Sequence, residues 1–230
     1  MAKTAAVNPE ILTAAMEAIL KEGKDVLYLG FSSGLSTTFN CGRIAAAALS
    51  EKYPEAKVLA VDTLAASAGQ GLLVYLAVQK RDAGATVEEV ADYLTENRLH
   101  MCHWFTVDDL VYLKRGGRVS PTAAFVGGML GIKPVMHVDN AGKLIPITKV
   151  RGRKVSLNAI VEKYGESAID PTAGPVFICH GDCMEDVNYL VGQLQAKYGV
   201  AVDLVTDIGP VIGAHSGPGT IALFYLGKER

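Results

Sequence analysis

The chain has 230 residues, half of them hydrophobic, and a mean hydropathy of +0.24, so it has enough apolar material for one large core or two small ones. A formal net charge of −2 and a pI near 6.2 provide no basic surface for nucleic acid, and we expect no nucleic-acid partner. No apolar run approaches the ~18 residues of a membrane span. The four cysteines have no framework spacing, so we expect a cytoplasmic protein with free thiols.

The first hundred residues alternate between helix and strand. Asn8 and Pro9 begin a helix as N-cap and first helical residue, and Gly23 ends it. Thr86 and Glu89 form a capping box that opens another helix. The other elements expected here are strands over residues 26–31 and 57–61 and helices over residues 40–52 and 65–82. Short connections between strands and helices predict a parallel sheet covered by helices.

The pattern changes after about residue 100. Two apolar runs flank Asp139-Asn140-Ala141-Gly142, which predicts a β-hairpin. The elements expected here are strands over residues 101–105, 132–138, 143–149, 176–180, 201–206 and 220–226, and helices over residues 107–115, 154–164 and 183–197. We therefore predict an α/β domain over residues 1–100 and an α+β domain over residues 101–230, with a ligand site in the cleft between them.

A hydroxyl-rich turn, residues 32–40, follows the first predicted strand and opens a helix. The carboxyl end of a parallel strand is where open α/β sheets bind ligands. An ordinary N-cap explains one serine or threonine, but the turn has more hydroxyls than one cap needs. Helix N-terminal amides and hydroxyls donate hydrogen bonds to an anion, so the turn predicts a site for a carboxylate or phosphate.

A single histidine, His215, lies in a distant turn rich in glycine and proline, residues 209–219. The turn residues fix the backbone around it, which favours a ligand contact over an isolated exposed histidine. A hydrolase with a triad of Ser36, His215 and Asp62 stays open as an alternative, although no spacing supports it. The serine turn is not a nucleophile elbow, because Thr38 stands where Gly-x-Ser-x-Gly needs its second glycine.

Three further patterns have more than one explanation. The segment Cys179–Cys183 predicts no metal site, because its first two residues point to opposite faces of a strand and no second cluster completes a ligand set. The basic clusters at residues 114–118 and 149–154 are either ordinary solvent-exposed charged residues or a surface that steers an acidic partner. The apolar run over residues 123–132 is core or the lining of an apolar tunnel. The tunnel candidates are Phe125, Met129, Leu130 and Ile132.

Seven segments, in order from about residue 4 to the C-terminus, carry a more specific signal. They are Ser33-Gly34-Leu35-Ser36-x-Thr38, Val61-Asp62-Thr63 with Ser67-x-Gly69-x-Gly71, Val107-Asp108-Asp109-Leu110-x-Tyr112-Leu113-Lys114-Arg115-Gly116-Gly117-Arg118, Ile132-Lys133-Pro134-Val135, Lys149-x-Arg151-Gly152, His180-Gly181-Asp182, and Gly209-Pro210-Val211-Ile212-Gly213-x-His215-Ser216-Gly217-Pro218-Gly219. Together they resemble the DegV family of bacterial fatty-acid-binding proteins. The resemblance implies a two-domain DegV-like α/β fold: a parallel sheet covered by helices, and an α+β domain with a mostly antiparallel sheet.

The resemblance also implies a non-catalytic carrier for one long-chain fatty acid, with no cofactor. The acyl chain would lie in an apolar tunnel of the second domain and the carboxylate at the domain junction. The expected carboxylate contacts are Thr4, Ser33, Ser36, Thr37, His215 and Ser216. Among them, Ser36 matches the family's loop hydroxyl, Thr4 its upstream threonine and His215 its loop histidine. A separate fatty acid kinase, docking at Arg118 and Arg151, would phosphorylate the carboxylate for phospholipid synthesis. A transient contact with a membrane surface would supply the lipid.

Two departures from the family bear on this expectation. The family's first strand, with its T-D-S-like motif, precedes the point that matches the start of this chain. We therefore expect a smaller first sheet, with a cleft that is open or completed by another chain. Thr37 replaces a glycine of the family motif and adds a side chain to the carboxylate pocket. The alternatives to a carrier are a small-molecule hydrolase or transferase using Ser36 and His215, and a divergent member without a ligand.

Overall fold

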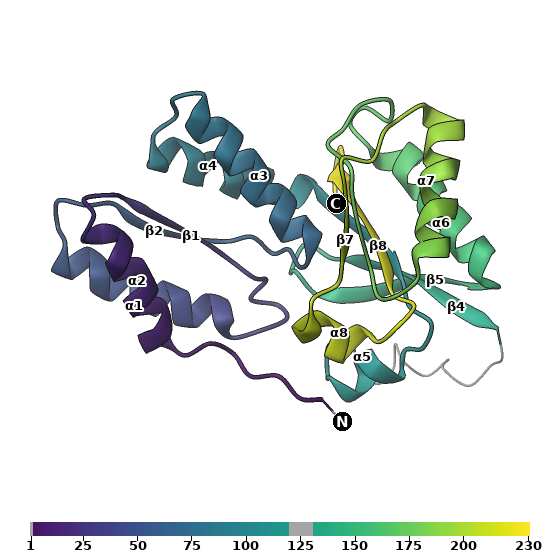
Figure 1. Cartoon of the computed structure of the whole chain (residues 1–230), viewed down its shortest axis with the longest axis horizontal. Helices are drawn as coiled ribbons and strands as arrows, with labels where there is room; N and C mark the ends of the chain where they lie inside the picture. Colours follow the sequence, from purple (N-terminus) through teal and green to yellow (C-terminus); the bar gives the residue numbers. More distant parts are fainter. Residues whose placement is uncertain (1, 120–130) are drawn as a thin grey trace.

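Two sheets organise the fold, which a computed structural model describes for residues 2–119 and 131–230 (Figure 1). In the first sheet, β1 (Val26–Gly30) pairs with β2 (Val58–Asp62) in parallel. The second sheet has the strand order β5-β4-β3-β8-β6-β7. Its strands are β3 (Met101–Thr106), β4 (Ile132–Val138), β5 (Leu144–Arg151), β6 (Phe177–His180), β7 (Leu204–Asp207) and β8 (Ile221–Leu226). Because β6 and β7 pair in parallel and the other recorded pairs are antiparallel, the predicted fold class is confirmed.

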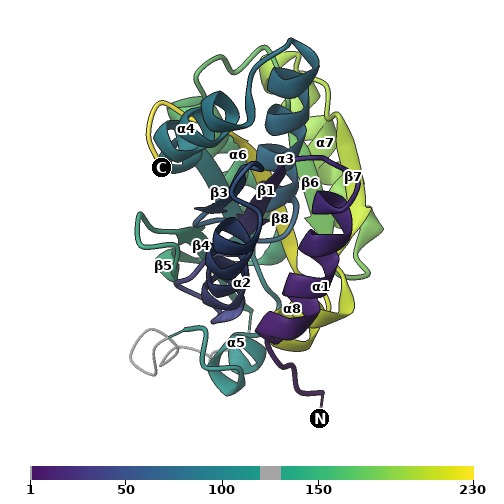
Figure 2. The same cartoon turned by 90° about the vertical axis from the view of Figure 1, so that its left-hand side faces the viewer.

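The first sheet packs against α1 (Pro9–Leu20) and α2 (Thr38–Lys52), which stand in front of it in Figure 2. The predicted start of α1 is confirmed. The Asn8 side chain accepts a hydrogen bond from the Ile11 amide at 3.0 Å, and Pro9 takes the first helical position, where no amide is needed. Both helices and both strands contribute to one buried cluster, formed by Met16, Leu20, Val26, Ala45, Ala46, Leu49 and Val58.

Helices α3 (Ala68–Asp82) and α4 (Val87–Asn97) connect the two sheets (Figure 1). The predicted capping box of Thr86 and Glu89 opens α4, and η1 (Arg98–His100) leads from α4 into β3. Helix α4 packs on β2, whereas α3 contacts β3, β6 and β8. One buried cluster therefore runs from Val61 on β2 through both helices to Phe224 on β8. The domain boundary near residue 100 stays a prediction, and in space α3 lies against the second sheet.

Alternate residues of the second sheet face different helices. Trp104 and Leu223 belong to the cluster beneath α6 (Arg153–Ser167) and α7 (Met184–Tyr198), whereas Phe105 and Phe224 belong to the cluster that includes α3. The hairpin of β4 and β5 is confirmed, and the Asp139 carboxylate accepts two backbone amides in its turn. The face toward α3 is also the one against which residues of β1 and β2 pack. The first sheet together with α1 and α2 is called the first unit of the fold below.

Three predicted elements are wrong in ways that affect the site. The helix predicted over residues 107–115 is shorter, α5 (Val111–Arg115). The residues before it make other contacts: the Asp109 carboxylate accepts the Val111 amide, and Lys133 on β4 donates to Asp108. Helix α3 begins at Ala68 because Ser67 has a φ of 54°, outside the right-handed helical region. The turn over residues 209–219 contains a short helix, α8 (Pro210–Ser216), whose last turn holds His215.

Two expectations from composition concern the cysteines and the membrane. All four cysteines carry free thiols, and Cys102 and Cys179 are buried. In the part of the chain that the structure describes, no helix has the length and apolar character that crossing a bilayer requires.

Candidate functional site

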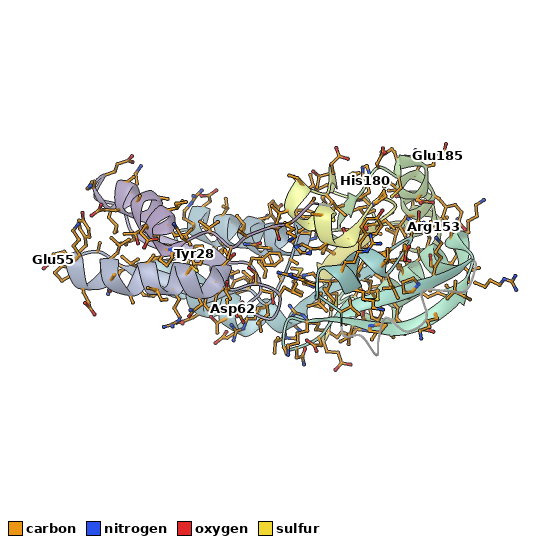
Figure 3. All side chains as sticks on the ribbon, turned by 90° about the horizontal axis from the view of Figure 1, so that it is seen from below. Tyr28, Glu55, Asp62, Arg153, His180 and Glu185 are labelled. Atoms are coloured by element: carbon orange, nitrogen blue, oxygen red, sulfur yellow. The ribbon has the colours of Figure 1, made fainter. Side chains whose placement is uncertain are left out.

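A cavity of about 700 Å³ lies between the first unit and the second sheet, a size typical of ligand pockets. Its wall includes the segment before α1, the start of α3, α8 and one face of the second sheet. It also includes the hydroxyl-rich loop after β1, which is residues 32–38 of the predicted turn. Figure 3 views the molecule from below, with α8 in yellow beside the narrow region between the two parts. The cavity therefore coincides with the cleft in which the sequence places a ligand.

Most of the cavity wall is apolar. Many of its large apolar residues come from the strands of the second sheet, the segment after β7, α5 and α8: Phe105, Leu113, Val138, Leu144, Ile208, Val211, Ile212 and Phe224. Val7, Phe31 and Leu35 add apolar surface from the first part of the chain. None of them was predicted to line the cavity. For the residues on strands, the alternation of side chains along each strand was the available signal. Of the predicted tunnel residues, Phe125, Met129 and Leu130 lie outside the described residues. Ile132 begins β4 and does not belong to the described wall.

The hydroxyl-rich loop is fixed by hydrogen bonds to both parts of the fold. Buried Ser32 donates from Oγ to the Gly142 carbonyl, in the turn between β4 and β5, at 2.8 Å. The Asp62 carboxylate, at the end of β2, accepts the Ser33 amide at 3.2 Å and the Leu64 amide at 3.1 Å. These bonds fix the position of the loop against both parts of the fold.

The loop places three predicted contact residues in the cavity wall: Ser33, Ser36 and Thr37. Thr37 precedes α2, but its side chain makes no capping hydrogen bond, so the ordinary N-cap explanation does not account for it. Ser36 Oγ lies 2.9 Å from Thr38 Oγ1 and accepts the Thr38 amide at 3.2 Å. The hydroxyls stand beside the first turn of α2, whose amides add to the attraction for an anion.

Helix α8 brings His215 to the same cavity. Its Nε2 lies 2.7 Å from Thr4 Oγ1, and both residues belong to the wall. Gly116 makes room for the ring, since a Cβ there would lie 2.2 Å from His215 Nδ1. Burial, and then the charge of Arg118, lower the pKa of His215 below its usual value, so the imidazole is neutral near pH 7.

Ser216 contributes a buried hydroxyl to the cavity wall. The residue is 5% exposed and lines the cavity, and its Oγ has no hydrogen-bond partner among the described residues. Its carbonyl accepts Thr220 Oγ1 at 3.0 Å, which anchors the end of α8. A buried hydroxyl without a partner costs roughly 1–3 kcal/mol. A ligand that offers an acceptor would remove that cost. All six predicted carboxylate contacts thus line one cavity, although their role stays a prediction.

The two predicted docking residues have different surroundings. Arg118 lines the cavity and is half-buried, and its side chain donates to the Leu35 carbonyl at 3.3 Å and to the Gly116 carbonyl. Arg151 is exposed at the end of β5, where it pairs with Ile132 on β4. Docking of a partner stays a prediction for both, and Arg118 is also placed to face a ligand in the cavity.

The geometry gives the hydrolase alternative no support. The recorded partners of Ser36, His215 and Asp62 are other residues, so no hydrogen bond joins the three in the described ranges 2–119 and 131–230. Within the same ranges, no group of three His, Cys, Asp or Glu side chains is placed to hold a metal ion.

Known proteins similar to this chain have the same fold. The family model described as "Uncharacterised protein, DegV family" matches residues 1–228. A DegV domain-containing protein of Clostridium perfringens is 45% identical over 230 residues, which are 100% of this chain and 79% of that protein. The structure of a DegV lipid binding protein from Thermotoga maritima is 34% identical with a TM-score of 0.86, over 99% of this chain and 78% of that one. A structure of fatty acid binding by a DegV family protein from Thermus thermophilus is 29% identical with a TM-score of 0.86, over 98% of this chain and 79% of that one.

Proposed function

This chain belongs to the DegV family, and from that premise we propose that it binds one long-chain fatty acid in the cavity between its two sheets. The composition of the cavity wall carries the proposal: an apolar lining is joined to several hydroxyls, the neutral imidazole of His215 and the guanidinium of Arg118. A fatty acid has the same two parts. The lipid-binding relative from Thermotoga maritima and the fatty-acid-binding relative from Thermus thermophilus support this class of ligand.

The carboxylate lies against the hydroxyl side of the wall in this proposal. The groups that hold it are those of Thr4, Ser33, Ser36, Thr37, His215 and Ser216. A hydrogen bond to a charged group contributes about 1.5–3 kcal/mol. The hydroxyl of Ser216 is the clearest donor, because it is buried and has no partner among the described residues. Thr37 adds a hydroxyl where the family motif has a glycine.

The acyl chain lies against the apolar side of the wall. Each buried CH₂ contributes about 0.8 kcal/mol, so the chain supplies much of the binding free energy and the carboxylate contacts supply specificity. Two titratable groups interrupt the apolar wall, and both are neutral at pH 7. Burial lowers the pKa of His103 well below its usual value and raises the pKa of Cys179 to about 11.

We further propose that the protein presents the bound carboxylate to a separate ATP-dependent kinase. Neutral donors hold a carboxylate by charge-assisted bonds without cancelling its charge. Its oxygen therefore keeps the electron pair that attacks the γ-phosphorus of ATP, which forms an acyl phosphate and releases ADP. Exposed Arg151 and half-buried Arg118 are the candidate kinase contacts, and a transient contact with a membrane surface supplies the lipid.

Native mass spectrometry of the purified chain, followed by organic extraction, tests the ligand. The expected result is one fatty-acid mass per chain and uptake of added palmitate. The alcohol 1-hexadecanol, which has the same chain length without the carboxylate, should bind roughly 10-fold more weakly. A ligand-free mass together with no uptake of palmitate or oleate would contradict the proposal. The kinase step is tested separately, by following acyl phosphate formation from the loaded protein with a purified fatty acid kinase and ATP.

A further inference from the structure

The side chain of Arg230 joins segments that are far apart in the sequence. Its Nε donates to the Met101 carbonyl at 3.0 Å, and its Nη2 donates to the Arg98 carbonyl. Its Nη1 donates to the Leu64 carbonyl at 2.9 Å and to the Asp139 carbonyl at 3.2 Å. One guanidinium thus connects the loop after β2, the turn before β3 and the hairpin of β4 and β5.

The acceptors recorded for this guanidinium among the described residues are backbone carbonyls rather than carboxylates. Burial lowers the pKa of Arg230 to about 10, so it is still charged at pH 7. A partly buried cation is costly unless several well-placed acceptors surround it. The planar fork of an arginine suits such a set, whereas a lysine offers its donors from a single nitrogen.

The first segment held by Nη1 supports one side of the hydroxyl-rich loop. Leu64 donates its amide to the Asp62 carboxylate at 3.1 Å, and the same oxygen accepts the Ser33 amide at 3.2 Å. The carbonyl of Leu64 is the group that Arg230 holds. A shift of Leu64 therefore moves the acceptor that positions Ser33.

The second segment held by Nη1 supports the other side of the loop. The Asp139 carboxylate accepts the amides of Ala141 and Lys143 and so shapes the hairpin turn. In that turn the Gly142 carbonyl accepts Ser32 Oγ at 2.8 Å. The contact is close, since a Cβ on Gly142 would lie 2.1 Å from Ser32 Oγ. The hydroxyl-rich loop therefore rests on two backbone segments that one nitrogen of Arg230 joins.

We propose that Arg230 is a positioning residue for the carboxylate site: it fixes the hydroxyl-rich loop, residues 32–38, by holding the Leu64 and Asp139 segments together. This inference rests on the proposed function for its ligand. Arg230 itself is not among the residues recorded in the cavity wall, so it acts through Ser32 and Ser33.

The test is the full chain with Arg230→Met, compared with the unchanged protein for binding of palmitate and of 1-hexadecanol. Palmitate affinity should fall about 10-fold, the loss expected for one hydrogen bond to a charged group, while hexadecanol affinity changes less than about 2-fold. Arg230→Lys should also lose selectivity for palmitate over hexadecanol, because a lysine cannot donate to all four carbonyls. This variant provides the test if Arg230→Met does not fold.

The control is Tyr164→Phe, which removes a hydrogen bond to the Pro171 carbonyl beneath the other face of the second sheet. It should lower the melting temperature and leave the ratio of palmitate to hexadecanol affinity unchanged. If Arg230→Met lowers both affinities equally, as a general loss of stability would, the inference is wrong.

Hydrogen–deuterium exchange of the ligand-free protein tests the positioning role of Arg230 without relying on fatty-acid binding. Arg230→Met should raise exchange in the peptide that covers residues 32–38, and Tyr164→Phe should not. An unchanged protein that binds neither palmitate nor hexadecanol would overturn the proposed function. Unchanged exchange over residues 32–38 in Arg230→Met would overturn the positioning role.

Discussion

Replacing Ser216 by alanine should raise the stability of the ligand-free protein and lower its affinity for a fatty acid. Ser216 is 5% exposed and its Oγ has no partner among the described residues, so the ligand-free protein bears roughly 1–3 kcal/mol for burying it. Alanine removes that cost. The lost bond to the bound carboxylate is worth about 1.5–3 kcal/mol, or roughly 10- to 150-fold in the dissociation constant.

Urea unfolding of the ligand-free protein and palmitate titration measure the two effects of Ser216→Ala. Ser156→Ala is the matched control, because Ser156 is also buried but donates to the Arg153 carbonyl at 2.7 Å, on α6 and outside the recorded cavity wall. The control should lose stability and keep its palmitate affinity. If Ser216→Ala lost stability and bound palmitate as tightly as the unchanged protein, the hydroxyl would be a structural group and the reasoning about the site would fail.

Three other changes test separate parts of the structure. Ser36→Ala should weaken palmitate binding by about 1.5–3 kcal/mol. Thr38→Val should have a smaller effect, because the Thr38 hydroxyl bonds Ser36 rather than supplying the main contact with the ligand. Equal losses of binding free energy in the two variants, measured by calorimetry, would contradict this assignment. His137 has a pKa lowered to about 4 by burial, so its contribution to stability is present above pH 6.5 and is lost as the pH falls toward 4, by on the order of 3 kcal/mol. His137→Phe should flatten the pH dependence of urea unfolding over that range, and an unaltered slope would exclude this group. Gly142→Ala should cost about 2 kcal/mol, because φ is +71° and the new Cβ meets Ser32 Oγ, and it should weaken palmitate binding as well; a variant with unchanged unfolding and unchanged binding would refute the account of the loop.

The elements that the sequence predicted well depend on local signals. The Asn8 cap, the Thr86 capping box and the turn after Asp139 each act within a few residues, and the structure contains all three. The start of α5 was predicted wrongly in part because a distant residue contacts the segment before it. Lys133 on β4 bonds both the carboxylate and the carbonyl of Asp108, which holds the residues before α5 in a non-helical conformation. No pattern within residues 107–115 contains that information.

The polar half of the candidate site was easier to predict than the apolar half. An excess of hydroxyls around Ser36 and a lone histidine at His215 stand out from their surroundings, and the family resemblance relates them to one ligand. Phe105, Val138 and Phe224 are ordinary strand residues by contrast. Only the register of β3, β4 and β8 brings them to the same face of the second sheet, and register between distant strands cannot be read from a single sequence.

Under the proposed function, we expect the support of the hydroxyl-rich loop to matter as much as the hydroxyls themselves. Each neutral donor contributes little unless its position is fixed in advance, because ordering a side chain on binding offsets the hydrogen bond it gains. Thr4, Ser36 and Ser216 come from the chain's first segment, the loop after β1 and the end of α8, so folding alone brings them together. The loop in turn depends on Gly142 of the second sheet through Ser32. We therefore expect selectivity for a carboxylate over an alcohol of equal length to depend on how firmly the two parts of the fold are joined, and affinity for the acyl chain to depend mainly on the apolar wall.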